Sequence, residues 1–212
     1  MESLRELYKI GRGPSSSHTM GPEKACLLFA TKHWEADAFS VVLYGSLAKT
    51  GKGHCTDKAI ISSFAPRPCE VHFDTETQSI PHPNTLDLFA YKGGEQIAHQ
   101  RVLSVGGGRI VIEGAPEEQA PHVYPLASFK EIAQVCEGRG IRLWQYAEEI
   151  EGPNFKAYML SVWEAMKRAI SRGLSDAGTL PGGIGVHKKA KQLLQMEHID
   201  ESAETRENRL VC

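Results

Sequence analysis

The sequence predicts an α+β fold, in which helices pack on a mixed, mostly antiparallel sheet and a helical segment follows toward the C-terminus. Residues 1–115 combine helical patterns with several short runs of alternating apolar residues, which is typical of this class. Glycine-rich bends at 93–94 and 106–108 separate three of those runs and predict antiparallel neighbours. From residue 127 onward the apolar residues repeat at helical spacing.

A short helix or turn is predicted at the N-terminus, followed by a hydroxyl-rich loop and a longer helix. Three apolar residues at the start of the chain have helix-like spacing: Leu4, Leu7 and Ile10. Pro22 suits the first turn of a helix, and residues 24–32 contain no helix breaker. The inner face of this helix would carry three side chains: Cys26, Phe29 and Ala30.

A buried strand and a second helix follow. Residues 39–44 are rich in β-branched and aromatic side chains, and Gly45 ends this predicted strand. A glycine-containing loop leads to a helix over residues 56–64, for which Thr56 is the expected N-cap.

Further strands are predicted before residue 114. Residues 69–74 alternate as a strand does, and the polar, proline-containing residues 75–85 predict a loop. Residues 86–108 predict a hairpin, and residues 109–113 predict a third strand after its closing glycine bend.

The chain is predicted to form two domains, residues 1–126 and residues 127–212. The proline-containing residues 114–125 are the best linker candidate. Ser128 and Glu131 have the spacing of a capping box at the start of the second domain.

The second domain is expected to be helical. Gly138 would close its first helix, and residues 155–172 predict a second helix that ends at Gly173. A glycine-rich loop at 178–185 leads into a basic helix start, whose lysines are interpreted as a solvated face. These lysines are Lys188, Lys189 and Lys191.

Composition narrows the classes of protein. The 212 residues are 41% hydrophobic and 24% charged, as in ordinary globular proteins, and they suffice for one substantial domain or one domain plus part of a second. The net charge of −2 gives no basic field, so we expect neither a nucleic-acid nor a membrane partner. No apolar run approaches the roughly 18 residues of a membrane span, and the N-terminus lacks a signal-peptide apolar region. We therefore expect a cytoplasmic protein.

The cysteines predict neither a disulfide framework nor a metal site. Their number, five, is odd, and no CxxC pair occurs. The five are Cys26, Cys55, Cys69, Cys136 and Cys212, and we interpret most of them as small buried apolar groups.

The hydroxyl-rich loop, GRGPSSSHTMGP, is the first place where chemistry is concentrated. Residues 15–19 place three serines, His18 and a threonine in a row. Neutral O–H donors suit a carboxylate or hydroxyl ligand, so the loop predicts a small-ligand site. The alternative is that these groups only cap and brace the helix that starts near Pro22.

A second candidate loop, GSLAKTGKGHCTD, covers residues 45–57. Free backbone N–H groups, a helix start and Lys52 together suit an anion, although the order of residues fits neither a P-loop nor a dinucleotide fingerprint. His54 and Asp57 have the spacing of a general base and an orienting carboxylate. The alternative is a histidine that merely braces the turn. Four other histidines lack ligand spacing and are interpreted as structural: His72, His82, His99 and His122.

These motifs resemble those of the iron–sulfur-dependent L-serine dehydratases, or L-serine ammonia-lyases. GPSSSHTMGP, YGSLAKTGKGHCTD, SVGGG and LPGGIGVHKKA occur in that family in this order and spacing, and the resemblance covers essentially the whole chain. Residues to about Leu126 resemble the family's β domain, which is similar to the allosteric substrate-binding domain of some 3-phosphoglycerate dehydrogenases. The remainder resembles the start of the α, or catalytic, domain.

The resemblance implies conversion of L-serine to pyruvate and ammonia with a 4Fe–4S cluster, one iron of which acts as a Lewis acid. It implies that His54 is the base that removes the Cα proton and that Asp57 orients it. It also implies a set of substrate-side residues: Ser16, Ser17, His18, Thr19, Thr50, Gly51, Lys52 and Gly53.

The family's cluster cysteines lie beyond the region that resembles this chain. We therefore expect a truncated polypeptide that ends within the α domain at Cys212, holds no cluster and is inactive alone. Its expected partners are L-serine, the missing α-domain continuation and a second copy in a homodimer. Two alternatives stay open: a stand-alone regulatory or assembly module that binds serine or another small anion without catalysis, and a phosphate-binding enzyme that uses Lys52.

Overall fold

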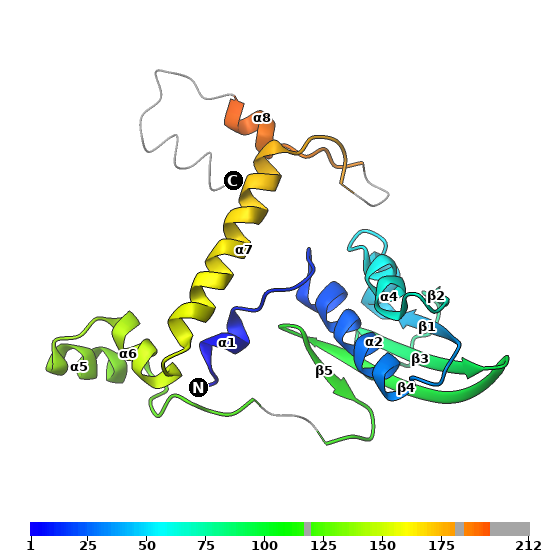
Figure 1. Ribbon diagram of the computed structural model, residues 1–212, viewed down its shortest axis with the longest axis horizontal. Helices are drawn as coiled ribbons and strands as arrows, with labels where there is room; N and C mark the ends of the chain where they lie inside the picture. The colour runs from blue at the N-terminus through cyan, green and yellow to red at the C-terminus, as the bar shows by residue number, and fades with distance from the viewer. Residues whose placement is uncertain (117–119, 181–184, 196–212) are drawn as a thin grey trace. The chain divides into compact units, whose positions relative to one another are not determined.

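The computed structural model describes residues 1–116, 120–180 and 185–195 (Figure 1). The chain divides into two compact units, residues 1–156 and 157–212. Within the described ranges, no helix combines the length and the apolar character needed to cross a bilayer.

A five-stranded sheet organises the first unit. Its strands are β1 (Ala38–Tyr44), β2 (Cys69–Asp74), β3 (Thr85–Lys92), β4 (Glu95–Gly106) and β5 (Arg109–Ile112), in the order β2-β1-β3-β4-β5. The pair β1 and β2 is parallel, and each of the other neighbours is antiparallel. This arrangement confirms the predicted α+β class with a mixed, mostly antiparallel sheet.

Helices α2 (Gly21–Lys32) and α4 (Thr56–Phe64) cover one face of this sheet (Figure 1). Strand β1 alternates, so that Phe39, Val41 and Leu43 are buried against the helices while the residues between them lie on the other face. The rings of Phe39 and Phe64 stack at a centroid distance of 4.1 Å. The predicted inner-face residues of the first long helix are buried, as expected: Cys26, Phe29 and Ala30.

Three short helical elements in the first unit are α1 (Leu4–Leu7), a π-helical turn η1 (Ser16–Met20) and α3 (Gly45–Thr50). The sequence predicted loops where η1 and α3 form, because neither carries a helical apolar pattern. Strand β1 ends before Gly45, as predicted. Gly45 has φ +52°, and a Cβ there would lie 2.5 Å from the Pro83 carbonyl oxygen, so only glycine fits this turn.

The predicted N-cap of α4 was wrong. The N-cap is Cys55, in the left-handed region at φ 55°, and no side chain caps the helix. Thr56 is fully buried, and its hydroxyl donates to the His18 carbonyl rather than to its own helix.

Helices α5 (Phe129–Arg139) and α6 (Leu143–Glu151) follow the sheet. The Ser128–Glu131 capping box is confirmed. Gly138 was wrongly predicted to close α5, since the left-handed Gly140 does so at φ 62°. Helix α6 was missed.

A small apolar cluster joins these helices to the N-terminal segment. Its buried members are Tyr124, Ile132, Cys136 and Tyr146, with Leu4 packed against them. The cluster combines residues from both sides of position 126, and the predicted boundary there stays a prediction.

The second unit contains α8 (Ala190–Gln195) and all of α7 (Phe155–Ser175) except its first two residues. Helix α7 passes through Gly173, which the sequence wrongly predicted as its end. The glycine-rich 178–185 loop lies partly outside the described residues, and so does Cys212.

Candidate functional site

The two loops that the sequence singled out meet in space. The imidazole rings of His18 and His54 lie 4.6 Å apart, with their planes tilted by 33°. The hydroxyl of Thr19 donates to the His54 carbonyl at 3.1 Å, and that of Thr56 donates to the His18 carbonyl at 2.6 Å. Both threonines are fully buried, where water cannot bond their hydroxyls, so each hydroxyl needs a partner within the protein. This reciprocal pair of bonds fixes one loop against the other.

The His18 ring is held at both of its nitrogens. Ser17 Oγ lies 2.9 Å from Nδ1, and Ser46 Oγ lies 2.9 Å from Nε2. Burial lowers the pKa of His18 below its ordinary value, and the neighbouring His54 lowers it further. The His18 ring is therefore held at both nitrogens, in surroundings that favour its neutral form.

His54 differs because only one of its nitrogens has a partner. Its Nδ1 lies 3.0 Å from the Thr50 carbonyl oxygen, which can only accept, so Nδ1 carries the proton. The lone pair is then on Nε2, to which no residue in the described ranges bonds. His54 is half-buried. This arrangement leaves Nε2 available as a proton acceptor.

Two charged residues near His54, Asp57 and Lys52, contact other parts of the chain. Asp57, expected to orient His54, instead accepts from the Lys58 N–H at 2.9 Å, and the Thr50 carbonyl orients the ring. The Lys52 ammonium lies 5.4 Å from the centroid of the Phe73 ring, a cation–π distance.

The other predicted substrate-side residues are placed around this pair. A Cβ on Gly51 would lie 2.2 Å from the Leu47 carbonyl oxygen, so this glycine is required by close packing. The Thr50 hydroxyl is already bonded, since it donates to the Ser46 carbonyl at 2.8 Å. Ser16 and Gly53 are exposed.

Sequence reasoning missed Ser46 and the role of Ser15. Ser46 N–H donates to the Pro83 carbonyl at 2.7 Å, which fixes the residue at the start of α3 beside His18. Ser15 is the N-cap of η1, and its Oγ accepts from the His18 N–H at 3.2 Å. Ser46 lies within the YGSLAKTGKGHCTD motif, but a predicted loop gave its side chain no direction.

The described cysteines do not fit an iron–sulfur cluster. Cys26 and Cys136 are buried, and burial raises the pKa of Cys69 to about 12. Across residues 1–116, 120–180 and 185–195, no three or more His, Cys, Asp or Glu side chains are grouped to hold a metal ion. We therefore derive no catalytic step through a cluster.

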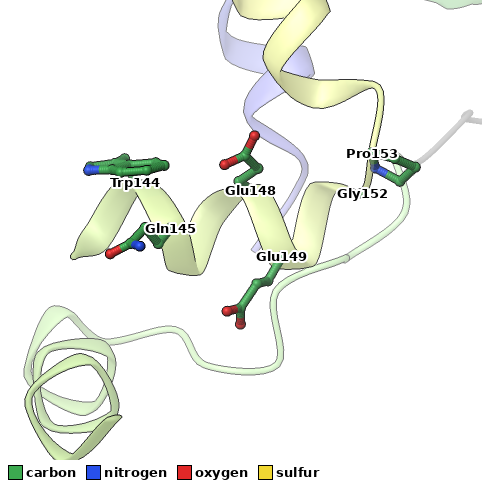
Figure 2. Close-up of a pocket in the computed structure, with 6 residues that line it drawn as sticks. All are labelled: Trp144, Gln145, Glu148, Glu149, Gly152 and Pro153. Atoms are coloured by element: carbon green, nitrogen blue, oxygen red, sulfur yellow. The ribbon is translucent and has the colours of Figure 1, made fainter. Parts of the chain in front are cut away.

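A shallow hollow along α6 is a weaker candidate site (Figure 2). It is lined by Trp144, Gln145, Glu148, Glu149, Gly152 and Pro153. Its charged side chains are carboxylates, and that of Glu149 is already paired with Arg139 at 2.9 Å. An acidic lining disfavours an anionic ligand, so we place the candidate site at the histidine pair.

Comparisons with known proteins show which family this chain resembles. Residues 3–70, which include both histidines, match the family model described as serine dehydratase beta chain. The chain is 32% identical to L-serine dehydratase 1 of Escherichia coli (strain K12), over 92% of this chain and 54% of that protein. It is 31% identical to L-serine dehydratase of Haemophilus influenzae, over 91% of this chain and 54% of that protein. The resemblance predicted from the motifs is confirmed, and the chain spans about half the length of these curated relatives.

Proposed function

We propose that this chain forms one wall of the active site of an L-serine ammonia-lyase, which converts L-serine to pyruvate and ammonia. The observation that carries the proposal is the His18–His54 pair, in which a fixed tautomer leaves Nε2 of His54 as a free proton acceptor. The named function of the relatives supports the same reaction.

In this proposal His54 is the general base. Its Nε2 takes the Cα proton of L-serine, and the electron pair of that C–H bond forms the Cα–Cβ double bond. The Cβ–O bond breaks with its own pair and releases hydroxide. The aminoacrylate product then takes up water and loses ammonia to give pyruvate. The bond from Nδ1 to the Thr50 carbonyl keeps the accepting nitrogen on the open side of the ring.

Six of the eight substrate-side residues divide into two groups, and the other two, Ser17 and His18, bond one another. Thr19, Thr50 and Gly51 already make the contacts that shape the loops, so we assign them a positioning role. Ser16, Lys52 and the backbone at Gly53 are exposed and are assigned to the substrate side. Asp57 is assigned no direct contact with His54.

The enzyme needs more than the residues described here. A 4Fe–4S cluster, implied by the family resemblance, would need ligands from elsewhere. We propose that the remaining part of a dehydratase completes the site, and that the assembly is a cytoplasmic homodimer. The alternative of a stand-alone serine-binding module is less favoured. The relatives that match about nine-tenths of this chain are named as dehydratases, which are enzymes.

The test uses protein purified from source cells in which the chromosomal copy of this chain carries an affinity tag. We expect the tagged protein, with whatever partner it retains, to release pyruvate from L-serine. His54→Ala should lower turnover by about two to four powers of ten, the usual contribution of a general base. His72→Ala is the matched control, because His72 is an exposed histidine on β2 and should leave turnover unchanged.

Two results would contradict the proposal. Near-normal turnover of His54→Ala would remove His54 from the base role. Serine binding without any dehydratase activity in the tagged, unsubstituted protein would favour the stand-alone module.

A further inference from the structure

We propose that Ser46 is a substrate-binding residue, the terminal donor of a hydrogen-bond chain that runs from Ser15 through Ser17 and His18 and ends on the substrate carboxylate. The inference rests on the proposed function, which supplies a substrate that carries a carboxylate. Ser46 is assigned no role by the motifs, and its importance comes from its contacts.

The direction of the chain follows from its first member. Ser15 Oγ accepts the backbone N–H of His18 at 3.2 Å, so its own O–H is left to donate. Ser17 Oγ is 3.4 Å away, close enough to receive that proton. Ser17 then donates to Nδ1 of His18 at 2.9 Å. Ser15 Oγ also lies 3.5 Å from the same Nδ1. Because a neutral imidazole has one donor and one acceptor, this direction of the chain assigns the His18 proton to Nε2.

The last link reaches Ser46. The Nε2–H of His18 donates to Ser46 Oγ at 2.9 Å, which occupies an acceptor site of this hydroxyl. The O–H of Ser46 is then free to donate, and no acceptor for it occurs among the residues that the structure describes. Linked hydrogen bonds polarise one another, so the terminal O–H is a better donor than an isolated serine. Ser46 is half-buried, within reach of a ligand.

The backbone holds Ser46 in this position. Its N–H donates to the Pro83 carbonyl at 2.7 Å, and its carbonyl accepts the Thr50 hydroxyl at 2.8 Å. The same Thr50 residue orients His54 through its carbonyl. Ser46 and His54 are therefore parts of one rigid turn.

The two free groups of this turn complement an α-amino acid. Such a substrate presents a carboxylate, which needs donors, next to a Cα–H, which needs a base. Ser46 O–H supplies a donor and His54 Nε2 supplies the base, and both residues contact the same His18 ring. The geometry thus selects for a negatively charged group adjacent to the carbon that loses its proton.

The first experiment reads the direction of the chain directly. Long-range ¹H–¹⁵N NMR spectra of the ¹⁵N-labelled 212-residue chain assign the protonated nitrogen of each histidine. We expect Nε2–H for His18 and Nδ1–H for His54. An Nδ1–H tautomer at His18 would reverse the chain and overturn the proposal. This measurement needs no substitution, so it does not depend on how a variant folds.

The second experiment measures steady-state kinetics on the tagged assembly described above. Ser46→Ala should raise KM for L-serine about 10- to 100-fold, the scale of a lost hydrogen bond to a charged group, with a smaller change in kcat. Ser46→Thr keeps the hydroxyl and should restore most of the affinity. Ser40→Ala is the control, because Ser40 bonds Tyr91 from the neighbouring strand and lies on the helix-free face of the sheet.

The outcomes separate this inference from the proposed function. An unchanged KM in Ser46→Ala, with active unsubstituted protein, overturns the role of Ser46 alone. A fall in kcat at constant KM also overturns it, since a ground-state carboxylate contact must appear in KM. An unsubstituted assembly without dehydratase activity overturns the proposed function, while the tautomer of His18 still tests the chain.

Discussion

Two clusters of polar side chains in the first unit both contain histidine but differ in how their hydrogen bonds are arranged. The sheet-face cluster consists of Tyr44, Asp87, His99 and Arg101. The loop cluster consists of Ser17, His18, Ser46 and His54. Both carboxylate oxygens of the first cluster are occupied, whereas the second leaves one proton acceptor and one donor without a partner among the described residues.

The sheet-face cluster is closed around a single buried carboxylate. Asp87 is 3% exposed, and Arg101 donates to it through Nε at 2.8 Å and Nη2 at 2.7 Å. Tyr44 donates at 3.0 Å, and His99 Nε2 lies 3.3 Å from the same carboxylate. Because these contacts use the hydrogen-bonding capacity of the carboxylate, Asp87 has no free acceptor site for a ligand. The structural role that the sequence analysis gives His99 is consistent with this geometry.

The loop cluster is open because its bonds run in series rather than converging on one group. Ser17, His18 and Ser46 are hydrogen-bonded one after another, whereas His54 contacts the His18 ring and bonds the Thr50 carbonyl. The comparison teaches that burial and histidine content alone do not mark a functional site. What marks it is a fixed polar group with unused hydrogen-bonding capacity.

The largest stability effect should come from opening the closed cluster. Arg101→Ala leaves the Asp87 carboxylate buried without its cation, which typically costs about 3–5 kcal/mol. Urea unfolding of the variant measures this loss. A double variant, Asp87→Leu with Arg101→Met, removes both charges and should restore most of the stability. A loss below about 1 kcal/mol in Arg101→Ala would mean that the cluster is more open to water than its contacts indicate.

A smaller effect should come from unlocking the two loops. Thr56→Val keeps the shape of the side chain but leaves the His18 carbonyl without its donor, which should cost about 1–3 kcal/mol. Thr31→Val is the control, because its hydroxyl bonds within α2 and the residue is exposed. If Thr56→Val unfolds at the same urea concentration as the control, other contacts hold the loops together.

Much of the fold was predictable because it depends on local pattern. Strand β2 and helix α4 form over the predicted ranges, and the hairpin bend at Gly93–Gly94 joins β3 and β4 as expected. Helix α6 was missed, although Leu143, Ala147 and Ile150 stand at helical spacing along it.

The candidate site was predictable only in part. The sequence identified both histidines as chemically unusual, but the contact between them depends on tertiary packing through Thr19 and Thr56. The position of Ser46 could not be predicted from the sequence, because it depends on Gly45 and on the Pro83 carbonyl, which is distant in sequence. Local pattern therefore predicts which loops matter, and long-range hydrogen bonds decide which atoms act.

The smallest effect should be a pH dependence that separates the two clusters. Burial, aided by His54, holds the pKa of His18 below its ordinary value of about 6.5, so the unfolded chain binds this proton more tightly than the folded chain. Stability should therefore fall as the pH drops through about 6.5 toward the lower folded pKa of His18.

Burial alone would raise the pKa of Asp87, but the bonds from Arg101 and Tyr44 outweigh it and lower the pKa. The contribution of Asp87 is thus present above about pH 4 and lost below it. Urea midpoints between pH 8 and pH 3 should show both steps, with His18→Gln removing the upper one and Asp87→Asn the lower one. If the upper step survives in His18→Gln, the step belongs to another histidine. The loop cluster would then lack the neutral His18 ring on which its directed hydrogen bonds depend.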